Sequence, residues 1–216
     1  MSKAAELAAL IGSQSAQGNR NILINGAMNV AQRGTSFTDV GGTNAVYTVD
    51  RFNIQNNGTA GRVTVTQESV TDLPGFANAL KLDVTTADTS IAAAEYFGIQ
   101  TRLEGNSLQQ LQKGTSSAKA VTLSFYAKGT AKTYVAELED NTSRVNGQKF
   151  TVSTSWQKFT LTYTGDTSGV IADDNAAGLN LHFWLHGGSN FTSGTFTSNT
   201  WASTVQANRM PGVGSI

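Results

Sequence analysis

Four stretches of the chain alternate between apolar and polar residues, which is the pattern of strands with one buried face. They cover residues 80–85, 121–128, 158–163 and 179–186. In each stretch a Leu, Val, Phe or other apolar residue at every second position alternates with more polar ones. This period of two predicts β-strands, each with an apolar face toward a core and a wetter face on the other side.

Weaker alternation predicts further short strands, separated by turns rich in Gly and Asn. These strands are residues 22–28, 47–54, 62–67, 95–103, 132–139, 148–152 and 201–206. Many short strands without intervening helices favour an all-β fold, a two-sheet antiparallel sandwich of the jelly-roll kind. We assign this sandwich to residues 21–216. We expect one core that contains seven side chains: Leu82, Leu123, Phe125, Phe159, Leu161, Leu181 and Phe183.

Residues 2–12 have helical periodicity and predict a short N-terminal α-helix. An apolar stripe that includes Leu7, Leu10 and Ile11 follows one side of it. About eleven residues are marginal for an isolated helix in water. We therefore predict that residues 1–20, the helix and a polar linker, dock on a carrier particle or join copies of the chain.

The charge balance narrows the range of partners. The 216 residues include 15 basic and 15 acidic side chains, for a net charge of zero. Binding to phosphate backbones needs clustered Lys and Arg, so we expect no nucleic-acid partner. The sequence has no cysteine, which excludes disulfides and thiol chemistry. No stretch has the ~20 apolar residues of a membrane helix, and the N-terminus does not have the pattern of a signal peptide, so we expect no membrane insertion.

His182, Trp184 and His186 alternate with the apolar positions of their strand, so they project from its polar face. An indole flanked by imidazoles on a polar sheet face is a candidate platform for sugar stacking. The alternative is a Trp covered by a loop or by a neighbouring subunit. The two histidines lie about 13 Å apart along a strand, too far for both to bind one zinc ion at ~2 Å. We therefore expect no metal ion between them.

Other acidic residues give weaker indications of a site. Residues 173–175, Asp-Asp-Asn, offer oxygen ligands to calcium, but an ordinary Asx turn is the favoured alternative. Carboxylates for polysaccharide hydrolysis would come from Glu95, Glu104, Glu137, Glu139 or the Asp residues, most of which we interpret as solvated charges at strand edges. The sequence shows neither a nucleophile motif nor a phosphate-binding loop. We therefore expect no catalytic residue, no metal and no cofactor.

Asp50 and Arg51 are neighbours in a predicted strand and point to opposite faces, so they cannot pair with each other. We expect one of them, or Arg33, to enter a partly buried ion pair that fixes the corner between the first strands. A structural role is favoured over a role in ligand binding.

Several strings along the chain resemble a family of β-sandwich domains found in bacteriophage virion proteins, chiefly tail fibres and capsid appendages of marine phages. The likeness begins with NILINGAMNVAQRGT at residues 21–35 and YTVDRF at residues 47–52. It continues through six further segments: residues 75–82, 99–105, 121–127, 154–159, 178–184 and 188–194. The resemblance implies a carbohydrate-binding-like jelly roll in a virion, made in the cytoplasm of a bacterial host.

The function that the resemblance implies is that of a non-enzymatic structural component of the virion, a fibre or a capsid or tail appendage, exposed at the surface and involved in host attachment. A glycan-binding adhesin module is the alternative, and a polysaccharide depolymerase is the third possibility. The implied partners are other virion proteins, a host surface glycan and further copies of the chain in a homotrimer.

Domains of the resembled family close with a further strand, which has no counterpart before Ile216. We therefore expect a sandwich that lacks its closing strand within these residues. Either the polypeptide continues beyond Ile216, or a strand from another chain fills the gap.

Overall fold

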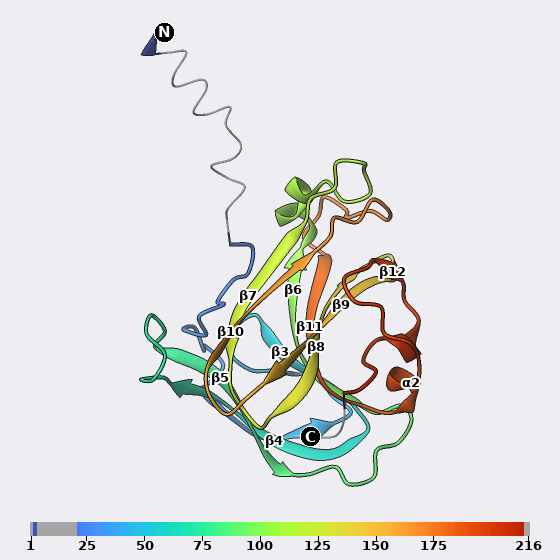
Figure 1. Ribbon diagram of the computed structural model, residues 1–216. Helices are drawn as coiled ribbons and strands as arrows, with labels where there is room; N and C mark the ends of the chain where they lie inside the picture. The colour runs from blue at the N-terminus through green and yellow to red at the C-terminus, as the bar shows by residue number, and fades with distance from the viewer. Residues whose placement is uncertain (1, 4–20, 214–216) are drawn as a thin grey trace.

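The computed structural model describes residues 2–3 and 21–213, and the described part is built from antiparallel β-sheets (Figure 1). The predicted fold class, an all-β antiparallel sandwich, is confirmed. Leu7, Leu10 and Ile11 of the predicted N-terminal helix lie outside the described residues.

The strands between residues 21 and 213 are β1 (Ser36–Gly42), β2 (Val46–Tyr47), β3 (Phe52–Asn57), β4 (Thr59–Ser69), β5 (Asn78–Thr86), β6 (Tyr96–Glu104), β7 (Val121–Ala127), β8 (Lys132–Asp140), β9 (Arg144–Val152), β10 (Gln157–Tyr163), β11 (Ala177–Gly187) and β12 (Ala202–Ser203). The helical segments there are short: α2 (Ser189–Thr192) and the 3-10 turns η2 (Gly105–Ser107), η3 (Gln109–Leu111) and η4 (Gln206–Asn208). No helix in this part of the chain is long and apolar enough to cross a membrane.

Seven of the described strands form one sheet, in the order β12–β9–β8–β11–β6–β3–β2. Facing it, the second layer of the described chain is divided into a three-stranded sheet, β1–β4–β5, and a two-stranded sheet, β10–β7. The two-stranded sheet lies across β8 and β11 in Figure 1. The three-stranded sheet packs on the half of the large sheet that contains β3 and β6.

Aromatic rings fill the space between the two-stranded sheet and the large sheet. The ring of Phe125 meets the rings of Phe150 and Phe183 edge-on, with centroids 5.0 Å apart in both pairs. It also stacks on Phe159 of the neighbouring strand at 5.3 Å. Such aromatic pairs stabilise a core beyond the area that they bury.

The predicted core side chains are buried or partly buried between the layers, but they divide between two of the four apolar clusters of the described residues. Six of the predicted seven belong to the aromatic cluster: Leu123, Phe125, Phe159, Leu161, Leu181 and Phe183. Leu82 instead packs in a second cluster with Val63 and Val65. The prediction of one common core is therefore wrong for Leu82, because β5 belongs to the separate three-stranded sheet.

Three predicted strands do not form as expected. Residues 47–54 are divided between β2 and β3 by a turn that contains Asp50 and Arg51, so these two residues do not lie in a strand. Residues 22–28 contain a turn instead of a strand, and Asn25 and Met28 have φ values of 59° and 56°, outside the range of regular strands. The Asn25 side chain fixes this segment by donating to the carbonyl oxygens of Val30 and Asp50, both at 2.9 Å. The strand expected at 201–206 shortens to β12, and η4 begins at its end.

A partly buried ion pair forms at Asp50, as predicted, but it joins the segment before β1 to the turn between β2 and β3 rather than two strands. The Asp50 carboxylate accepts a hydrogen bond from the backbone N–H of Gln32 at 3.1 Å and pairs with Arg33 at 3.2 Å. Its side chain is 17% exposed. Arg51 points elsewhere and pairs with Glu104, so neighbouring residues of opposite charge serve two different contacts.

Replacing Phe125 with Ala is expected to lower the free energy of unfolding by about 3 kcal/mol. The reason is the loss of three ring contacts and the cavity that would remain between the layers. The value lies at the lower end of the range for Phe-to-Ala changes because the ring is only partly buried. Urea unfolding followed by fluorescence measures the change.

The matched control is Ser124→Ala, one position earlier on the opposite, exposed face of β7. We expect this variant to stay within about 0.5 kcal/mol of the parent protein. Equal losses in the two variants would contradict the assignment of Phe125 to the core.

Candidate functional site

The outer face of the large sheet, turned away from the second layer, carries the polar residues of its central strands. In β11 the apolar residues face the core, so His182 and Trp184 project from the other side. The antiparallel register places His182 beside Gln100 of β6 and Glu137 of β8. Residues far apart in the sequence therefore meet on this one surface.

A cleft of about 660 Å³ lies above these strands. Its floor comes from β3, β6, β8 and β11, and its wall comes from α2 and the segment around η4. It is lined by amide, aromatic and charged side chains together with two small residues: Gln55, Tyr96, Gln100, Glu139, His182, Trp184, Asn190, Phe191, Ser193, Gln206, Ala207 and Arg209. Of the three residues suggested by the sequence, His182 and Trp184 line the cleft and His186 does not.

Trp184 is covered rather than displayed on an open face. It is 4% exposed, and Met210 and Val213 pack with it in a small apolar cluster. The His182 ring stacks on the indole with centroids 4.6 Å apart, and Cζ of Arg209 lies 5.0 Å from the indole centroid. The predicted open stacking platform is therefore corrected: the C-terminal segment covers the indole, as in the alternative interpretation.

The absence of a side chain at Gly98 leaves space for the indole of Trp184. Gly98 lies opposite Trp184 in the pairing of β6 with β11. A Cβ atom at this position would come within 2.9 Å of the indole Cε3 and within 2.7 Å of the carbonyl oxygen of Phe183. Any larger residue would therefore displace the ring and the segment that covers it.

Arg209 pairs with both carboxylates beneath the cleft. Its guanidinium forms an ion pair with Glu137, which is 1% exposed, and its Nη2 atom lies 2.9 Å from Oε2 of Glu139. Nε1 of Trp184 also donates a hydrogen bond to Glu137, at 3.0 Å. Burial of an unpaired carboxylate is strongly unfavourable, so these contacts tie the C-terminal segment to β8. The interpretation of Glu137 and Glu139 as solvated charges is therefore wrong.

Glu139 contacts both the cleft and this network. Burial alone would raise its pKa, but the hydrogen bond with Nε2 of His182, at 2.9 Å, and the positive charge of Arg209 outweigh burial and lower the pKa to about 2. Glu139 is therefore ionised at neutral pH and acts as a hydrogen-bond acceptor. A general acid for glycoside hydrolysis needs the opposite, a raised pKa.

The amides of the cleft divide into a fixed floor and an exposed rim. On the floor, Nε2 of Gln55 donates to Oε1 of Gln100 at 2.9 Å, which fixes both side chains. At the rim, Asn190, Ser193 and Gln206 are exposed. The cleft thus offers pre-positioned polar groups below and adaptable hydrogen-bonding groups above, which suits a ligand that has many hydroxyl groups.

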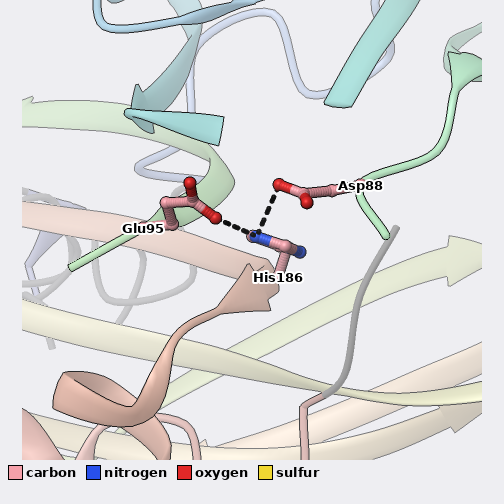
Figure 2. A group of neighbouring side chains, drawn as sticks. All are labelled: Asp88, Glu95 and His186. Atoms are coloured by element: carbon pink, nitrogen blue, oxygen red, sulfur yellow. Dashed lines mark ion pairs between the residues drawn. The ribbon is translucent and has the colours of Figure 1, made fainter. Parts of the chain in front are cut away.

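His186 belongs to a different group of residues. The pairing of β11 with β6 shifts by one residue between Trp184 and His186, and the His186 ring lies beside Asp88 and Glu95 (Figure 2). The two histidines therefore have separate carboxylate neighbours. Glu95 is 9% exposed, so its interpretation as a solvated charge is also wrong.

The acidic turn at residues 173–175 is an Asx turn. Oδ1 of Asp174 accepts a hydrogen bond from the backbone N–H of Ala176 at 3.0 Å. This confirms the alternative to a calcium site. By contrast, Asp88 and Arg209 gave no sequence signal, because each reaches its group from a loop whose path the local pattern does not reveal.

Comparison with known proteins gives one partial likeness of interest. No protein-family model matches the chain, and no curated protein matches it. Among solved structures it is similar to the enzymatically active domain of tailspike protein 4 of bacteriophage CBA120, with a TM-score of 0.40 and 14% identity. The similarity covers 62% of this chain and 17% of that chain. It is a similarity to a phage tail-associated protein, and it assigns no substrate or activity to this chain.

The expectation that the protein has no enzymatic activity is corrected by this comparison. The similar tailspike domain is itself enzymatically active. Tests of this chain therefore measure hydrolysis together with binding.

Glu139 is expected to make stability depend on pH in the acid range. Its pKa of about 2 in the folded protein lies below the ordinary value of 4.5, so its contribution is fully present above about pH 4.5 and is lost as the pH falls toward 2. A Glu139→Gln variant is expected to be less stable than the parent at pH 7, by about 1–3 kcal/mol. This difference should shrink steadily between pH 5 and pH 2, as measured by urea unfolding at each pH.

The control is Glu104→Gln, which removes a surface ion pair with Arg51 whose partners are 40% and 43% exposed. Such exposed pairs contribute little, so this variant is expected to follow the pH curve of the parent. Parallel curves for the parent and the Glu139 variant would contradict the assigned pKa.

Proposed function

We propose that the protein binds a host-surface glycan in this cleft and serves as a phage tail-associated attachment protein. The observation that carries the proposal is the cleft of about 660 Å³ with a fixed polar floor and an exposed amide rim. Sugar hydroxyls both donate and accept hydrogen bonds, and amide side chains provide both functions.

The aromatic residues of the cleft give it an apolar side. The rings of Tyr96 and Phe191 meet edge-on with centroids 5.4 Å apart, and Phe191 is partly exposed in α2. Tyr96 in turn packs edge-on against Trp184. The C–H faces of a sugar ring would lie against Phe191 and Tyr96 rather than against the covered indole.

The charges beneath the cleft favour an uncharged glycan. Two carboxylates, Glu137 and Glu139, share one guanidinium, that of Arg209. Because the pKa of Glu139 is lowered to about 2, this carboxylate stays ionised at neutral pH. The excess negative charge disfavours the carboxylates of acidic polysaccharides, so we assign the cleft to neutral sugars.

The phage setting rests on the sequence resemblance of residues 21–35 and of the later strands to virion proteins. Within the virion, we place the sandwich outward, where the cleft meets the host surface.

We also propose that residues 1–20 join three copies of the chain or dock them on the particle. The support is the apolar stripe that contains Leu7, Leu10 and Ile11, which a short helix cannot leave in water without a partner. Rotational symmetry is the usual solution for such assemblies.

A glycan array with the full-length protein is expected to show binding to neutral host glycans and weaker binding to acidic ones. The double variant Asn190→Ala, Gln206→Ala removes two exposed amides of the rim. We expect its affinity for the selected glycan to fall about ten-fold or more, because each lost hydrogen bond is worth about 1 kcal/mol. Isothermal titration calorimetry measures the affinity, and release of new reducing ends measures any hydrolysis.

The matched control is Gln157→Ala, an exposed amide on β10 on the other layer of the sandwich. It is expected to bind as the parent does. Equal losses in the control and the rim variant, or preferential binding of acidic glycans by the parent, would refute the assignment of the cleft.

Deletion of residues 1–18 is expected to leave a folded sandwich that no longer assembles. Light scattering should find a trimer for the full chain and a monomer for the shortened one, with the same thermal midpoint for the sandwich. A monomeric full chain, together with a shortened chain that still joins the particle, would contradict the role given to this segment.

A further inference from the structure

Two groups of one histidine and two carboxylates occur among the described residues. The group under the cleft, which contains His182, includes a cation, because Arg209 pairs with both of its carboxylates. The second group consists of Asp88, Glu95 and His186 (Figure 2). It also contains one histidine and two carboxylates, but no arginine or lysine of the described residues pairs with its carboxylates.

The side chain of His186 is buried and has no hydrogen-bond partner. It is 0% exposed, and neither ring nitrogen makes a hydrogen bond with any described residue. Its Nε2 atom points toward Oδ2 of Asp88 at 3.8 Å and Oε2 of Glu95 at 4.0 Å. Both distances are too long for hydrogen bonds. A buried polar ring that approaches two carboxylates without bonding to either calls for a further atom between them.

Hydrogen bonds from the protein hold the Asp88 and Glu95 carboxylates in position. Asp88 is 3% exposed, and its Oδ2 atom accepts hydrogen bonds from Oγ1 of Thr59 at 2.8 Å and from the backbone N–H of Ala60 at 3.2 Å. Oε2 of Glu95 accepts one from the backbone N–H of Ala92 at 2.8 Å. The group is thus built into the fold before any ligand arrives.

No Lys or Arg among the described residues forms an ion pair with Asp88 or Glu95. Buried carboxylates are normally paired with cations or coordinate metals, so a positively charged partner is missing from this group.

We propose that Asp88, Glu95 and His186 bind one divalent transition-metal ion, with zinc as the best fit. The Nε2 atom of His186 and one oxygen from each carboxylate provide three ligands. Water completes the coordination, as is usual at zinc sites with three protein ligands.

The spacing of the ligand atoms suits such an ion. Two atoms that each lie ~2.0–2.2 Å from zinc are roughly 3.4 Å apart at a tetrahedral angle. The three candidate atoms lie within 4.8 Å of one another, and the two distances to Nε2 exceed the tetrahedral value by a few tenths of an ångström. A small inward movement of the carboxylates closes the site around the ion.

The histidine ligand makes the site selective for zinc over calcium and magnesium. Calcium and magnesium prefer shells made of oxygen only, whereas imidazole favours zinc and its neighbours in the first transition series. The site also has too few protein oxygens for the six to eight ligands that calcium takes. We therefore expect selection of zinc over calcium.

The proposed ion would connect the β5–β6 loop to the wall of the cleft. The carbonyl oxygen of Glu95 accepts a hydrogen bond from the backbone N–H of Gly188 at 2.8 Å, and that of Ala93 accepts one from Asn190 at 2.9 Å. Asn190 lies in α2, and Tyr96 follows Glu95 directly; both line the cleft. The ion therefore fixes the loop against which α2 rests, and the metal site does not depend on which ligand the cleft takes.

The test uses the full chain without a histidine tag, stripped with a chelator and then dialysed against micromolar Zn²⁺. The sequence has two histidines, so few adventitious sites compete. We expect one zinc per chain by elemental analysis, a higher thermal midpoint with Zn²⁺ than without it, and no such shift with Ca²⁺.

Variants distinguish the two groups of residues. His186→Gln and Asp88→Asn are each expected to weaken zinc binding by roughly ten-fold or more, whereas His182→Gln is expected to retain one zinc per chain. Absence of zinc uptake by the parent would overturn the proposal. So would loss of zinc in the His182 variant together with its retention in the His186 variant.

A direct measurement on the unmodified protein covers the case in which the His186 and Asp88 variants do not fold. Crystals grown with Zn²⁺ are expected to show an anomalous peak at the zinc edge between His186, Asp88 and Glu95. A peak beside His182 alone, or no peak, would refute the site.

Discussion

The buried ion pair between Arg209 and Glu137 is the interaction on which the rest of the outer face depends. Glu137 is 1% exposed, and Arg209 reaches it from the C-terminal segment. Removing one partner of such a pair leaves an uncompensated buried charge, at a cost of about 3–5 kcal/mol. The segment is therefore fixed over β8 and β11, and Met210 and Val213 pack on Trp184 behind it. The cleft exists because the sheet has this cover.

The same pair decides what the cleft offers to a ligand. The Trp184 indole lies under the guanidinium and beside His182, so its role is to support the floor. The groups that line the cleft above this floor are the amides, the Glu139 carboxylate and the rim of α2 and η4. This arrangement, with the excess of carboxylates beneath it, supports the proposed recognition of a neutral sugar.

The two groups of one histidine and two carboxylates differ in one residue, because only the His182 group has an arginine, Arg209, beside it. In the His182 group, Arg209 pairs with both carboxylates. The Asp88, Glu95 and His186 group has no Lys or Arg partner among the described residues, and its imidazole has no hydrogen bond. The first group has an arginine partner and the second does not, and this difference supports a bound cation at the second group. It also connects the two sites, because the β5–β6 loop that contains Asp88 supports α2.

The sequence by itself determined the all-β class and the strands with strict alternation. A period of two is a local property, and the residues of β7, β10 and β11 satisfy it without reference to any neighbour. It also determined that His182 and Trp184 share the face away from the core. Tertiary structure alone decided what covers that face, because Arg209, Asp88 and Asn25 act through contacts with residues distant in sequence. The burial of Glu137 and the partial burial of Glu139 were likewise undetectable in the sequence. These two carboxylates of β8 become covered because the C-terminal segment places Arg209 beside them.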